Sequence, residues 1–363
     1  MVHALIMAGG VGSRFWPKSK EEKPKQFLSF FEDERTLIQT TIERIKPLIP
    51  LERIIVSTNA RYVDLVREQI PELPEENIIG EPVAKNTAPC IAFAASLIHY
   101  RDPDAAMVVL PSDHYIREND IFINDINTCI KSLDEDSDRL VTLGIVPNRP
   151  ETGYGYIQYD DSKLIKIDEQ HAYPVKTFAE KPDMQTAIKF LQSGDFLWNS
   201  GMFIWKCKKI FEQIQMHLPV LYHQTQVFSE HLKKNDGKIK PETLKNVYES
   251  CFSVSIDFGI MEKSDNVIVI PSNFHWSDLG SWMSIYEIHK NIGDKDGNVL
   301  YDSDTITVNS QNCYLNVQTD KKIALVGLHG IGVIETDDSL LICKLEKSQD
   351  VKQVFDLLPK KSK

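Results

Sequence analysis

The chain has 363 residues, of which 42% are hydrophobic and 26% are charged, as is ordinary for a soluble globular protein. Its formal net charge of −11 argues against a nucleic-acid-binding surface spread over the whole molecule. The six cysteines include no CxxC pair and lie among apolar residues, which predicts reduced, buried thiols. The chain opens without a signal-peptide pattern and contains no run of roughly 18 apolar residues, so we expect a cytoplasmic protein without membrane contact.

The first 150 residues alternate between predicted strands and predicted helices. Apolar strands are expected at 5–8, 53–57, 78–79, 106–110 and 140–146, and helices at 39–49, 62–70, 87–100 and 122–133. This α/β alternation predicts a Rossmann-like, mostly parallel mixed sheet with helices on both faces. Ligands of such sheets bind beyond the carboxyl ends of the strands.

A glycine loop follows the first strand, at Gly9, Gly10 and Gly12. Backbone N–H groups of such a loop can hold phosphate oxygens, and cations nearby can neutralise them. Five cations follow the loop, namely Arg14, Lys18, Lys20, Lys23 and Lys25. The loop is neither a P-loop nor a dinucleotide fingerprint, because Gly-Lys-Ser/Thr is missing and Phe15 replaces the third glycine of GxGxxG. The alternative interpretation is a tight turn with a solvated basic face.

The second half of the chain changes character twice. From about residue 152 it becomes rich in aromatic and β-branched segments, with helices expected at 209–228 and 242–251 and a strand at 266–270. Beyond 297, short apolar strands alternate with Asp, Asn, Gly and Ser turns, and a terminal helix is expected at 350–358. We therefore divide the chain into a main domain at 1–288 and a small β domain at 289–363.

Two strings near the N-terminus, GGVGSRFWPKS and EKPKQF, resemble the opening motif of the sugar-1-phosphate nucleotidyltransferases. Within that family, the segments FWP at 15–17 and PKQF at 24–27 are most similar to mannose-1-phosphate guanylyltransferases. Further matching strings are LPSDH at 110–114, FAEKP at 178–182 and WSDLGSW at 276–282. The resemblance implies transfer of GMP from GTP to α-D-mannose 1-phosphate, with Mg²⁺ or another divalent cation. It also implies a C-terminal left-handed β-helix that contributes to a homodimer.

The resemblance assigns roles to individual residues of this chain. Arg14 and Lys25 are the implied catalytic cations, and Asp113 and Asp278 are the implied metal ligands. The implied nucleotide-binding residues are Ala8, Gly9, Gly10, Gly12, Ser13, Asn86, Thr87 and Ser112. The implied sugar-phosphate-binding residues are Gly155, Glu180, Lys181, Asn199, Ser200 and Gly201.

Each of these assignments has a structural alternative. Two carboxylates suit Mg²⁺, which prefers oxygen ligands and completes its shell with water and substrate phosphates. Asp113 could instead cap the loop after its strand, and Asp278 could begin a turn before Gly280. Asn86 and Thr87 could cap the helix that follows them. Glu180 and Lys181 could form an exposed strand end, and residues 199–201 a glycine turn.

The implied chemistry is an in-line attack of the sugar phosphate on the α-phosphorus of GTP. The attacking phosphate is already ionised near neutral pH, since its second pKa is about 6, so no general base is required. Two alternatives stay open: a guanylyltransferase for another sugar 1-phosphate, and a non-catalytic protein that senses nucleotide sugars. The residues alone assign no role to His114 or to Asp257, which lies in the string SIDFG.

Overall fold

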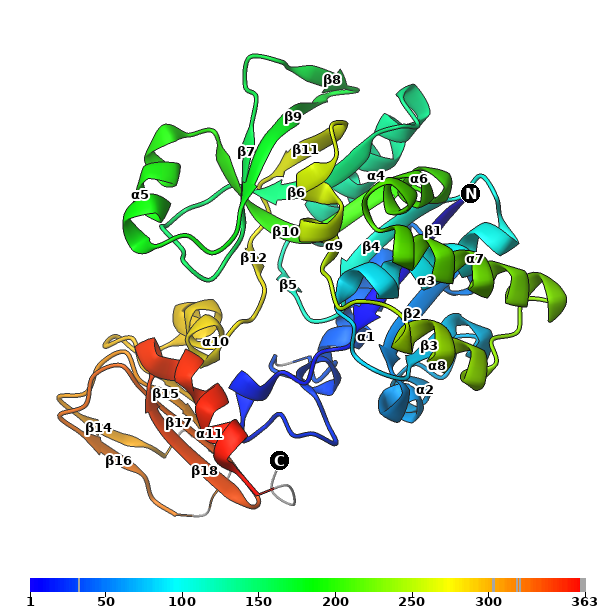
Figure 1. Cartoon of the computed structure of the whole chain (residues 1–363). Helices are drawn as coiled ribbons and strands as arrows, with labels where there is room; N and C mark the ends of the chain where they lie inside the picture. Colours follow the sequence, from blue (N-terminus) through cyan, green and yellow to red (C-terminus); the bar gives the residue numbers. More distant parts are fainter. Residues whose placement is uncertain (32, 302–303, 318, 320, 360–363) are drawn as a thin grey trace. The chain divides into compact units, whose positions relative to one another are not determined.

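The computed structural model describes residues 1–31, 33–301, 304–317, 319 and 321–359. Its internal contacts divide the chain into two compact units that interleave along the sequence (Figure 1). Unit 1 comprises Met1–Gly9, Thr41–Ser112 and Ile116–Trp276. Unit 2 comprises Gly10–Thr40, Asp113–Tyr115 and Ser277–Lys363.

A mixed sheet with the order β3-β2-β1-β4-β10-β6-β11-β9-β7 forms the centre of unit 1, and β8 pairs with β9. As expected, β1 runs parallel to β2 and β4, and β2 runs parallel to β3. Strand β10 is antiparallel to both β4 and β6 and lies between them, while β11 runs parallel to β6. The strands are β1 (Val2–Ala8), β2 (Ile54–Asn59), β3 (Ile78–Glu81), β4 (Ala106–Pro111), β6 (Leu140–Ile145), β7 (Tyr156–Tyr159), β8 (Ile165–Ile167), β9 (Gln170–Ala179), β10 (Phe196–Lys206) and β11 (Val267–Ser272).

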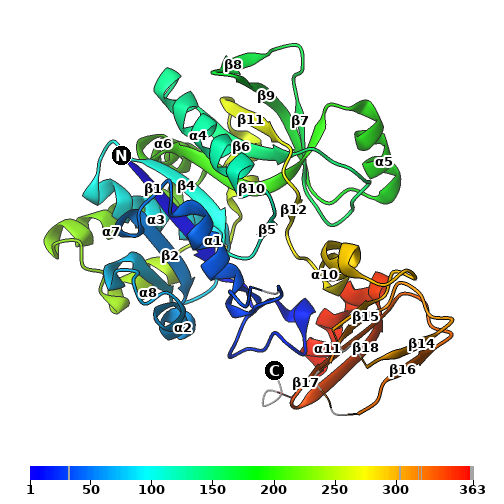
Figure 2. The same ribbon diagram turned by 180° about the vertical axis from the view of Figure 1, so that it is seen from behind.

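Helices cover both faces of this sheet. Figures 1 and 2 show α3, α6 and α7 on one face and α4 on the other. The predicted mixed α/β sheet with helices on both faces is thus confirmed. The helices of this part of the chain are α1 (Leu37–Ile45), α2 (Val63–Gln69), α3 (Thr87–Arg101), α4 (Asn119–Glu135), α5 (Met184–Ser193), α6 (Cys207–His217), α7 (Pro219–Lys234), α8 (Pro241–Glu249) and α9 (Ile256–Gly259).

Helix α3 is buried around its whole circumference over residues 88–98, because its sequence is apolar on every side. It forms the core of unit 1 with β1, β4, α6, α7 and α8. The prediction of helical structure over 209–228 is confirmed, and it takes the form of two helices, because α6 ends at His217 and α7 begins at Pro219. Proline lacks the N–H that a helix interior needs, but it fits the first helical position.

The second unit joins an N-terminal segment to the C-terminal strands. Phe15 packs against Phe30 with ring centroids 5.0 Å apart and against Trp282 at 5.3 Å. The indole Nε1 of Trp282 donates a hydrogen bond to the carbonyl of Trp16 at 3.1 Å. Residues 10–40 therefore belong to the same compact unit as the C-terminal strands. The cluster that contains Phe15 and Trp282 also includes Tyr314 and Ile334, so it crosses the predicted domain boundary at 288/289, which itself stays a prediction.

The strands of unit 2 stack in parallel, as expected for a β-helix. β13 pairs with β15, β15 with β17, and β14 with β16, all in parallel, whereas β18 is antiparallel to β17. Their bounds are β13 (Val299–Leu300), β14 (Ile306–Val308), β15 (Tyr314–Asn316), β16 (Ala324–Val326), β17 (Ile331–Thr336) and β18 (Ser339–Lys344). Two further helices, α10 (Trp282–His289) and α11 (Val351–Leu357), belong to this unit. The short strands β5 (Tyr115–Ile116) and β12 (Trp276–Ser277) lie where the chain passes between units.

All six cysteines are free, and the five at 90, 129, 207, 251 and 313 are buried as predicted, whereas Cys343 is only half-buried. Within the described ranges, the helices are too short or too polar for any of them to cross a membrane.

Candidate active site

The glycine loop of unit 2 needs a glycine at position 12. Its backbone φ of +70° is left-handed, and a Cβ at this position would lie 2.3 Å from the Cβ of Lys25. Gly10 is different, since a Cβ there would meet no described atom within 4 Å. Side chains brace the loop backbone, because Gln26 Nε2 donates to the Gly10 carbonyl at 2.9 Å and Ser19 Oγ donates to the Val11 carbonyl at 2.7 Å. The loop is therefore held in a fixed shape before any ligand arrives.

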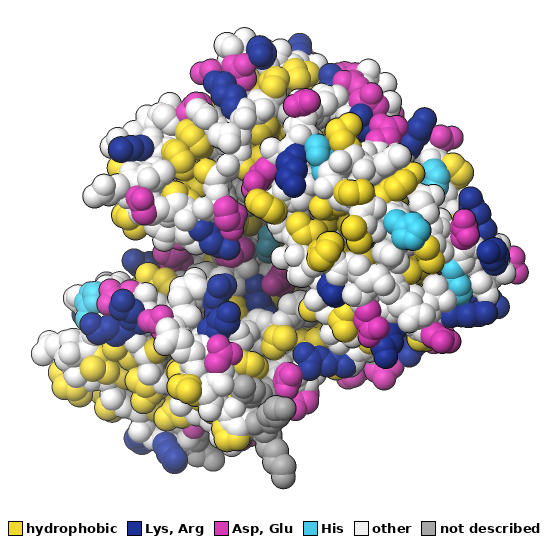
Figure 3. All heavy atoms as spheres, in the orientation of Figure 1, with side chains coloured by type: hydrophobic (Ala, Val, Ile, Leu, Met, Phe, Trp, Pro, Cys, Tyr) yellow, Lys and Arg dark blue, Asp and Glu magenta, His cyan; other side chains and the backbone are white. Residues whose placement is uncertain are grey.

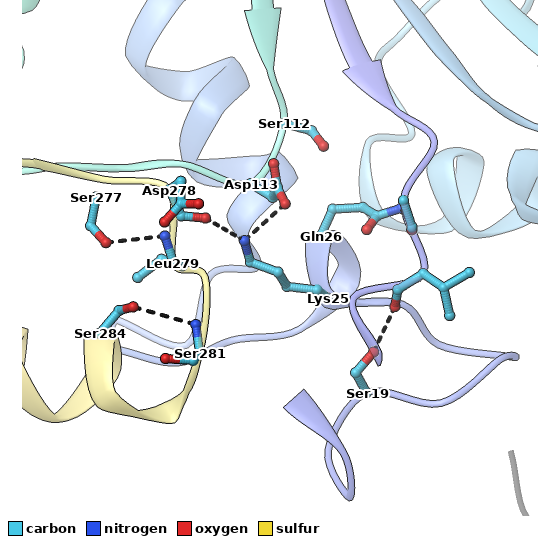
Figure 4. Close-up of polar contacts among 12 residues, drawn as sticks. Ser19, Lys25, Gln26, Ser112, Asp113, Ser277, Asp278, Leu279, Ser281 and Ser284 are labelled. Carbon is cyan, nitrogen blue, oxygen red and sulfur yellow. Dashed lines mark hydrogen bonds and ion pairs between the residues drawn. The ribbon is translucent and has the colours of Figure 1, made fainter. Parts of the chain in front are cut away.

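Lys25 joins three segments of unit 2 that are far apart in the sequence. Lys25 begins the 3₁₀ turn η2 (Lys25–Phe27), and only 5% of its surface is exposed. Its ammonium donates to Asp113 Oδ2 at 2.8 Å and to the backbone carbonyl of Asp278 at 2.7 Å (Figure 4). The predicted catalytic lysine and the two predicted metal ligands are thus brought together.

The charge of Lys25 keeps Asp113 ionised. Burial opposes the ionisation of Asp113, but the ammonium of Lys25, through its charge and its hydrogen bond, holds the pKa of Asp113 below its ordinary value. An ionised carboxylate is the form that binds a divalent cation.

The backbone around Leu279 places Asp278. Leu279, the next residue, has a φ of +48°, which is uncommon for a residue other than glycine. Its N–H donates to Ser277 Oγ at 3.0 Å, and its side chain is completely buried. A Cβ added at Gly280 would lie 3.1 Å from Asp278 Oδ1, so the glycine gives that carboxylate room. The positive φ of Leu279 and the glycine at 280 thus leave the Asp278 carboxylate at the cavity, while the alternative of a turn before Gly280 stays a prediction.

These residues line one cavity of unit 2 with a volume of about 290 Å³. Its lining includes Gly12, Ser13, Arg14, Lys25, Asp113 and Asp278, together with His114 and Lys352. Among the described residues, no group of three or more His, Cys, Asp and Glu side chains is arranged to hold a metal. Two carboxylates on one cavity nevertheless fit Mg²⁺, which takes one or two protein carboxylates and completes its shell from substrate phosphates and water.

A second group of predicted residues gathers in unit 1, around β10. Asn199 Nδ2 donates to Asp257 Oδ1 at 2.7 Å, and Asn199 Oδ1 accepts a hydrogen bond from Gly201 N at 3.0 Å. The pairing of β10 with β6 shifts register between Asn199 and Phe203, and such an irregularity re-aims side chains. A Cβ at Gly155 would lie 2.9 Å from Glu180 Oε2 and 3.5 Å from the Asn199 Cβ. Gly155 therefore lets Glu180 approach Asn199.

Asp257 belongs to this second group, although sequence reasoning assigned it no role. Burial, and to a lesser degree the nearby charge of Glu180, raises the pKa of Asp257 above its ordinary value. Its hydrogen bond fixes which way the Asn199 amide faces. The signal available in the sequence was the string SIDFG, whose serine caps the short helix α9.

The remaining predicted residues of unit 1 have structural partners. Asn86 Oδ1 accepts from Thr87 N at 2.8 Å and caps α3, which confirms the capping alternative for Asn86. Thr87 Oγ1 accepts from Ile256 N at 2.8 Å, so it holds the start of α9. Ser200 Oγ is buried and donates to the Leu143 carbonyl at 2.6 Å, which does not support a contact from this side chain to a sugar phosphate.

The predicted site residues divide between the two units. Ala8, Gly9, Asn86, Thr87, Ser112 and the six sugar-phosphate candidates lie in unit 1. Gly10, Gly12, Ser13, Arg14, Lys25, Asp113 and Asp278 lie in unit 2. Glu180 and Lys181 form an ion pair of 2.8 Å, and both side chains are more than half exposed. This exposure agrees with the alternative of an exposed strand end. Lys352 was missed, because nothing in the sequence links a lysine of the terminal helix to the glycine loop.

Comparisons with known proteins agree on one family. The profile of the "Nucleotidyl transferase" family matches residues 3–295, and that of the "MannoseP isomerase/GMP-like beta-helix domain" matches residues 303–358. Mannose-1-phosphate guanylyltransferases of Klebsiella pneumoniae and Escherichia coli are each 38% identical over 361 residues, covering 99% of this chain and 74% of theirs. A Thermus thermophilus crystal structure titled "mannose-1-phosphate geranyltransferase" has a TM-score of 0.83 at 27% identity and covers 98% of each chain.

Proposed function

Since the chain belongs to the nucleotidyl transferase family, we propose that it transfers GMP from GTP to α-D-mannose 1-phosphate, giving GDP-mannose and pyrophosphate. The family assignment makes it an enzyme, and the names of its relatives support this sugar and this nucleotide. The observation that carries the proposal is the meeting of Lys25 with Asp113 and Asp278 on one cavity beside the glycine loop. A glycine loop, cations and paired carboxylates are what two phosphate-bearing substrates require.

The proposed reaction is an in-line displacement at the α-phosphorus of GTP. An oxygen of the sugar phosphate forms the new bond, and the bond to the bridging oxygen breaks, so that its electron pair leaves with pyrophosphate. The attacking phosphate, with a second pKa of about 6, needs no general base at neutral pH. The protein must instead align two anions and neutralise the charge between them.

Four charged residues of the cavity have a part in that neutralisation. Asp113 and Asp278 would hold Mg²⁺ or another divalent cation, which supplies positive charge to the reacting phosphates when bound. Lys25 is buried and hydrogen-bonded on both sides, so it orients these two segments and adds fixed positive charge. Arg14 is exposed on the loop and lines the same cavity, where it can bind phosphate oxygens.

The sugar phosphate is assigned to the group around Asn199. Glu180 and the Asn199 amide offer hydrogen-bond acceptors and donors to sugar hydroxyls, and Lys181 offers a cation to the phosphate. Asp257 fixes the orientation of the Asn199 amide by accepting from its Nδ2. We therefore place Asp257 beside the predicted sugar-binding residues as a positioning residue.

A homodimer in the cytoplasm is part of the proposal. The homodimer is supported by the apolar surface of the C-terminal strands, where Figure 3 shows exposed hydrophobic side chains. Ile306, Val326, Leu340 and Ile342 are each more than half exposed there. Light scattering after size-exclusion chromatography would give twice the 41.5 kDa chain mass for a dimer. The chain mass itself would contradict this part alone.

Isotope transfer tests the proposed reaction. With GTP labelled at the α-phosphate and mannose 1-phosphate, the label is expected in GDP-mannose and not in pyrophosphate. Label retained in GTP, with GTP still bound, would favour the alternative of a nucleotide-sugar sensor. Label transferred only to another sugar 1-phosphate would leave the mechanism and change the substrate.

A further inference from the structure

The terminal helix of unit 2 is fixed against the glycine loop. Val351 and Phe355 of α11 are four residues apart on one helix face, and both are buried in the cluster that contains Phe15. Phe15 ends the 3₁₀ turn η1 (Ser13–Phe15), which carries Arg14. Helix α11 therefore packs on the turn that forms part of the cavity, and its exposed Lys352 lines that cavity.

Of the three cations that line the cavity, one has an ion-pair partner and two have none among the described residues. Lys25 forms an ion pair with Asp113 and donates a hydrogen bond to the Asp278 carbonyl. Over the described part of the chain, neither Arg14 nor Lys352 has a salt bridge. The two cations therefore line the same cavity as Gly12 and Ser13 of the glycine loop, and in the described residues no salt bridge joins either cation to a carboxylate. Such an arrangement favours an anion that carries several charges.

We propose that Lys352 binds the terminal phosphates of the nucleotide, the part that leaves as pyrophosphate. The α-phosphorus must react near Asp113 and Asp278, whereas Lys352 and Arg14 come from α11 and η1, which pack on each other. As the bond to the α-phosphorus breaks, negative charge develops on the departing pyrophosphate. A lysine and an arginine placed beforehand stabilise this charge without the cost of gathering them during the reaction.

The proposal gives the C-terminal segment a part in the phosphate site. Residues 345–350 form the 3₁₀ segment η8 that leads from β18 into α11, so the β domain sets the position of Lys352. The inference rests on the proposed function for the identity of the nucleotide. The predicted binding of a polyphosphate by Lys352 is independent of the proposed function, because binding can be measured without turnover.

The test measures the binding of inorganic pyrophosphate by titration calorimetry, in the presence of Mg²⁺, to the full chain. Lys352→Met is expected to weaken binding about tenfold, as for the loss of one charged hydrogen bond, and Lys352→Arg to restore most of it. Lys347→Met is the matched control, because Lys347 is an exposed lysine of the same segment that does not line the cavity. It removes the same charge and should leave the Kd within about twofold.

Three results would overturn the inference: no measurable pyrophosphate binding by the wild type, an unchanged Kd in Lys352→Met, or an equal loss in Lys347→Met. Unchanged circular dichroism of Lys352→Met shows that the fold is kept, as expected for an exposed side chain. Failure of the proposed function gives a different pattern. In that case the wild type transfers no nucleotide to any sugar, while the difference between the Lys352 and Lys347 variants persists.

Discussion

The ammonium of Lys25 lies 2.8 Å from Oδ2 of Asp113, although the two residues are 88 positions apart in the sequence. The same ammonium lies 2.7 Å from the backbone carbonyl of Asp278, which is 253 positions away. One buried cation thus fixes the glycine loop, the segment that follows β4 and the segment before α10 relative to one another. This contact makes a catalytic role for Lys25 testable.

Lys25→Ala is expected to lower turnover about 100-fold or more, with a much smaller change in the KM for mannose 1-phosphate. The substitution removes a fixed positive charge and releases Asp113 and the Asp278 backbone from their common donor. Steady-state kinetics of pyrophosphate release measure both constants.

The control for this substitution is Lys23→Ala. Lys23 is an exposed lysine of the same loop, and it is not among the residues that line the cavity. Its variant should turn over like the wild type. Near-normal turnover in Lys25→Ala would remove Lys25 from the proposed catalytic residues.

Asp113→Asn and Asp278→Asn are each expected to raise the Mg²⁺ concentration needed for half-maximal activity by about tenfold or more. An amide is a poorer ligand than a carboxylate for this hard cation, and both side chains line one cavity. Asp104→Asn, at an exposed aspartate of unit 1, is the control for a general charge effect. A wild-type Mg²⁺ titration curve in either cavity variant would contradict the paired-carboxylate site.

Asp257→Ala is expected to raise the KM for mannose 1-phosphate about tenfold and to leave the KM for GTP nearly unchanged. The substitution removes the acceptor that orients the Asn199 amide. Asp257→Asn keeps an acceptor oxygen and should have a smaller effect. Equal losses toward both substrates, together with a lower Tm, would indicate a structural role only.

The stability of unit 1 should depend on His3 in mildly acidic solution. Burial, partly opposed by the charge of Asp102, lowers the pKa of His3 from 6.5 to about 4. Neither ring nitrogen has a hydrogen-bond partner in the described part of the chain. Between these two pH values the unfolded chain binds a proton that the folded chain does not. His3 therefore stabilises the fold fully above pH 6.5, and this contribution decreases as the pH falls toward 4.

The expected loss from this residue is roughly 2 kcal/mol at pH 5 relative to pH 7.5. Denaturant titrations of the wild type and of His3→Phe at both pH values measure it. The phenylalanine variant should lose less stability on acidification by about that amount. An equal loss in both proteins would show that His3 is not the titrating group.

The sequence predicted most of the sheet, because parallel strands that are buried on both faces are continuous apolar runs. The predicted strand at 106–110, for example, appears as β4, Ala106–Pro111. The place of β10 between β4 and β6 was not predictable, since an antiparallel insertion depends on distant pairing rather than on local pattern. The predicted helices over 209–228 appear as α6 and α7, and proline at the first position of α7 marks the boundary between them.

Residues of the candidate site were predictable where they belong to a short sequence motif. The glycine loop and the two aspartates were found from motifs, and Lys25 joins them as a contact that no spacing could specify. Ser200 matched a motif but uses its hydroxyl to hold the backbone. Lys352 was missed because its place at the cavity depends on how α11 packs against η1.

The central claim is tested most directly by measuring pyrophosphate release with Mg²⁺ across a grid of nucleoside triphosphates and sugar 1-phosphates. The account predicts the highest rate for GTP with mannose 1-phosphate. A higher rate for another pair would contradict the assigned specificity while leaving the reaction class in place. No release from any pair, by protein that is folded by circular dichroism, would contradict the proposed enzymatic function.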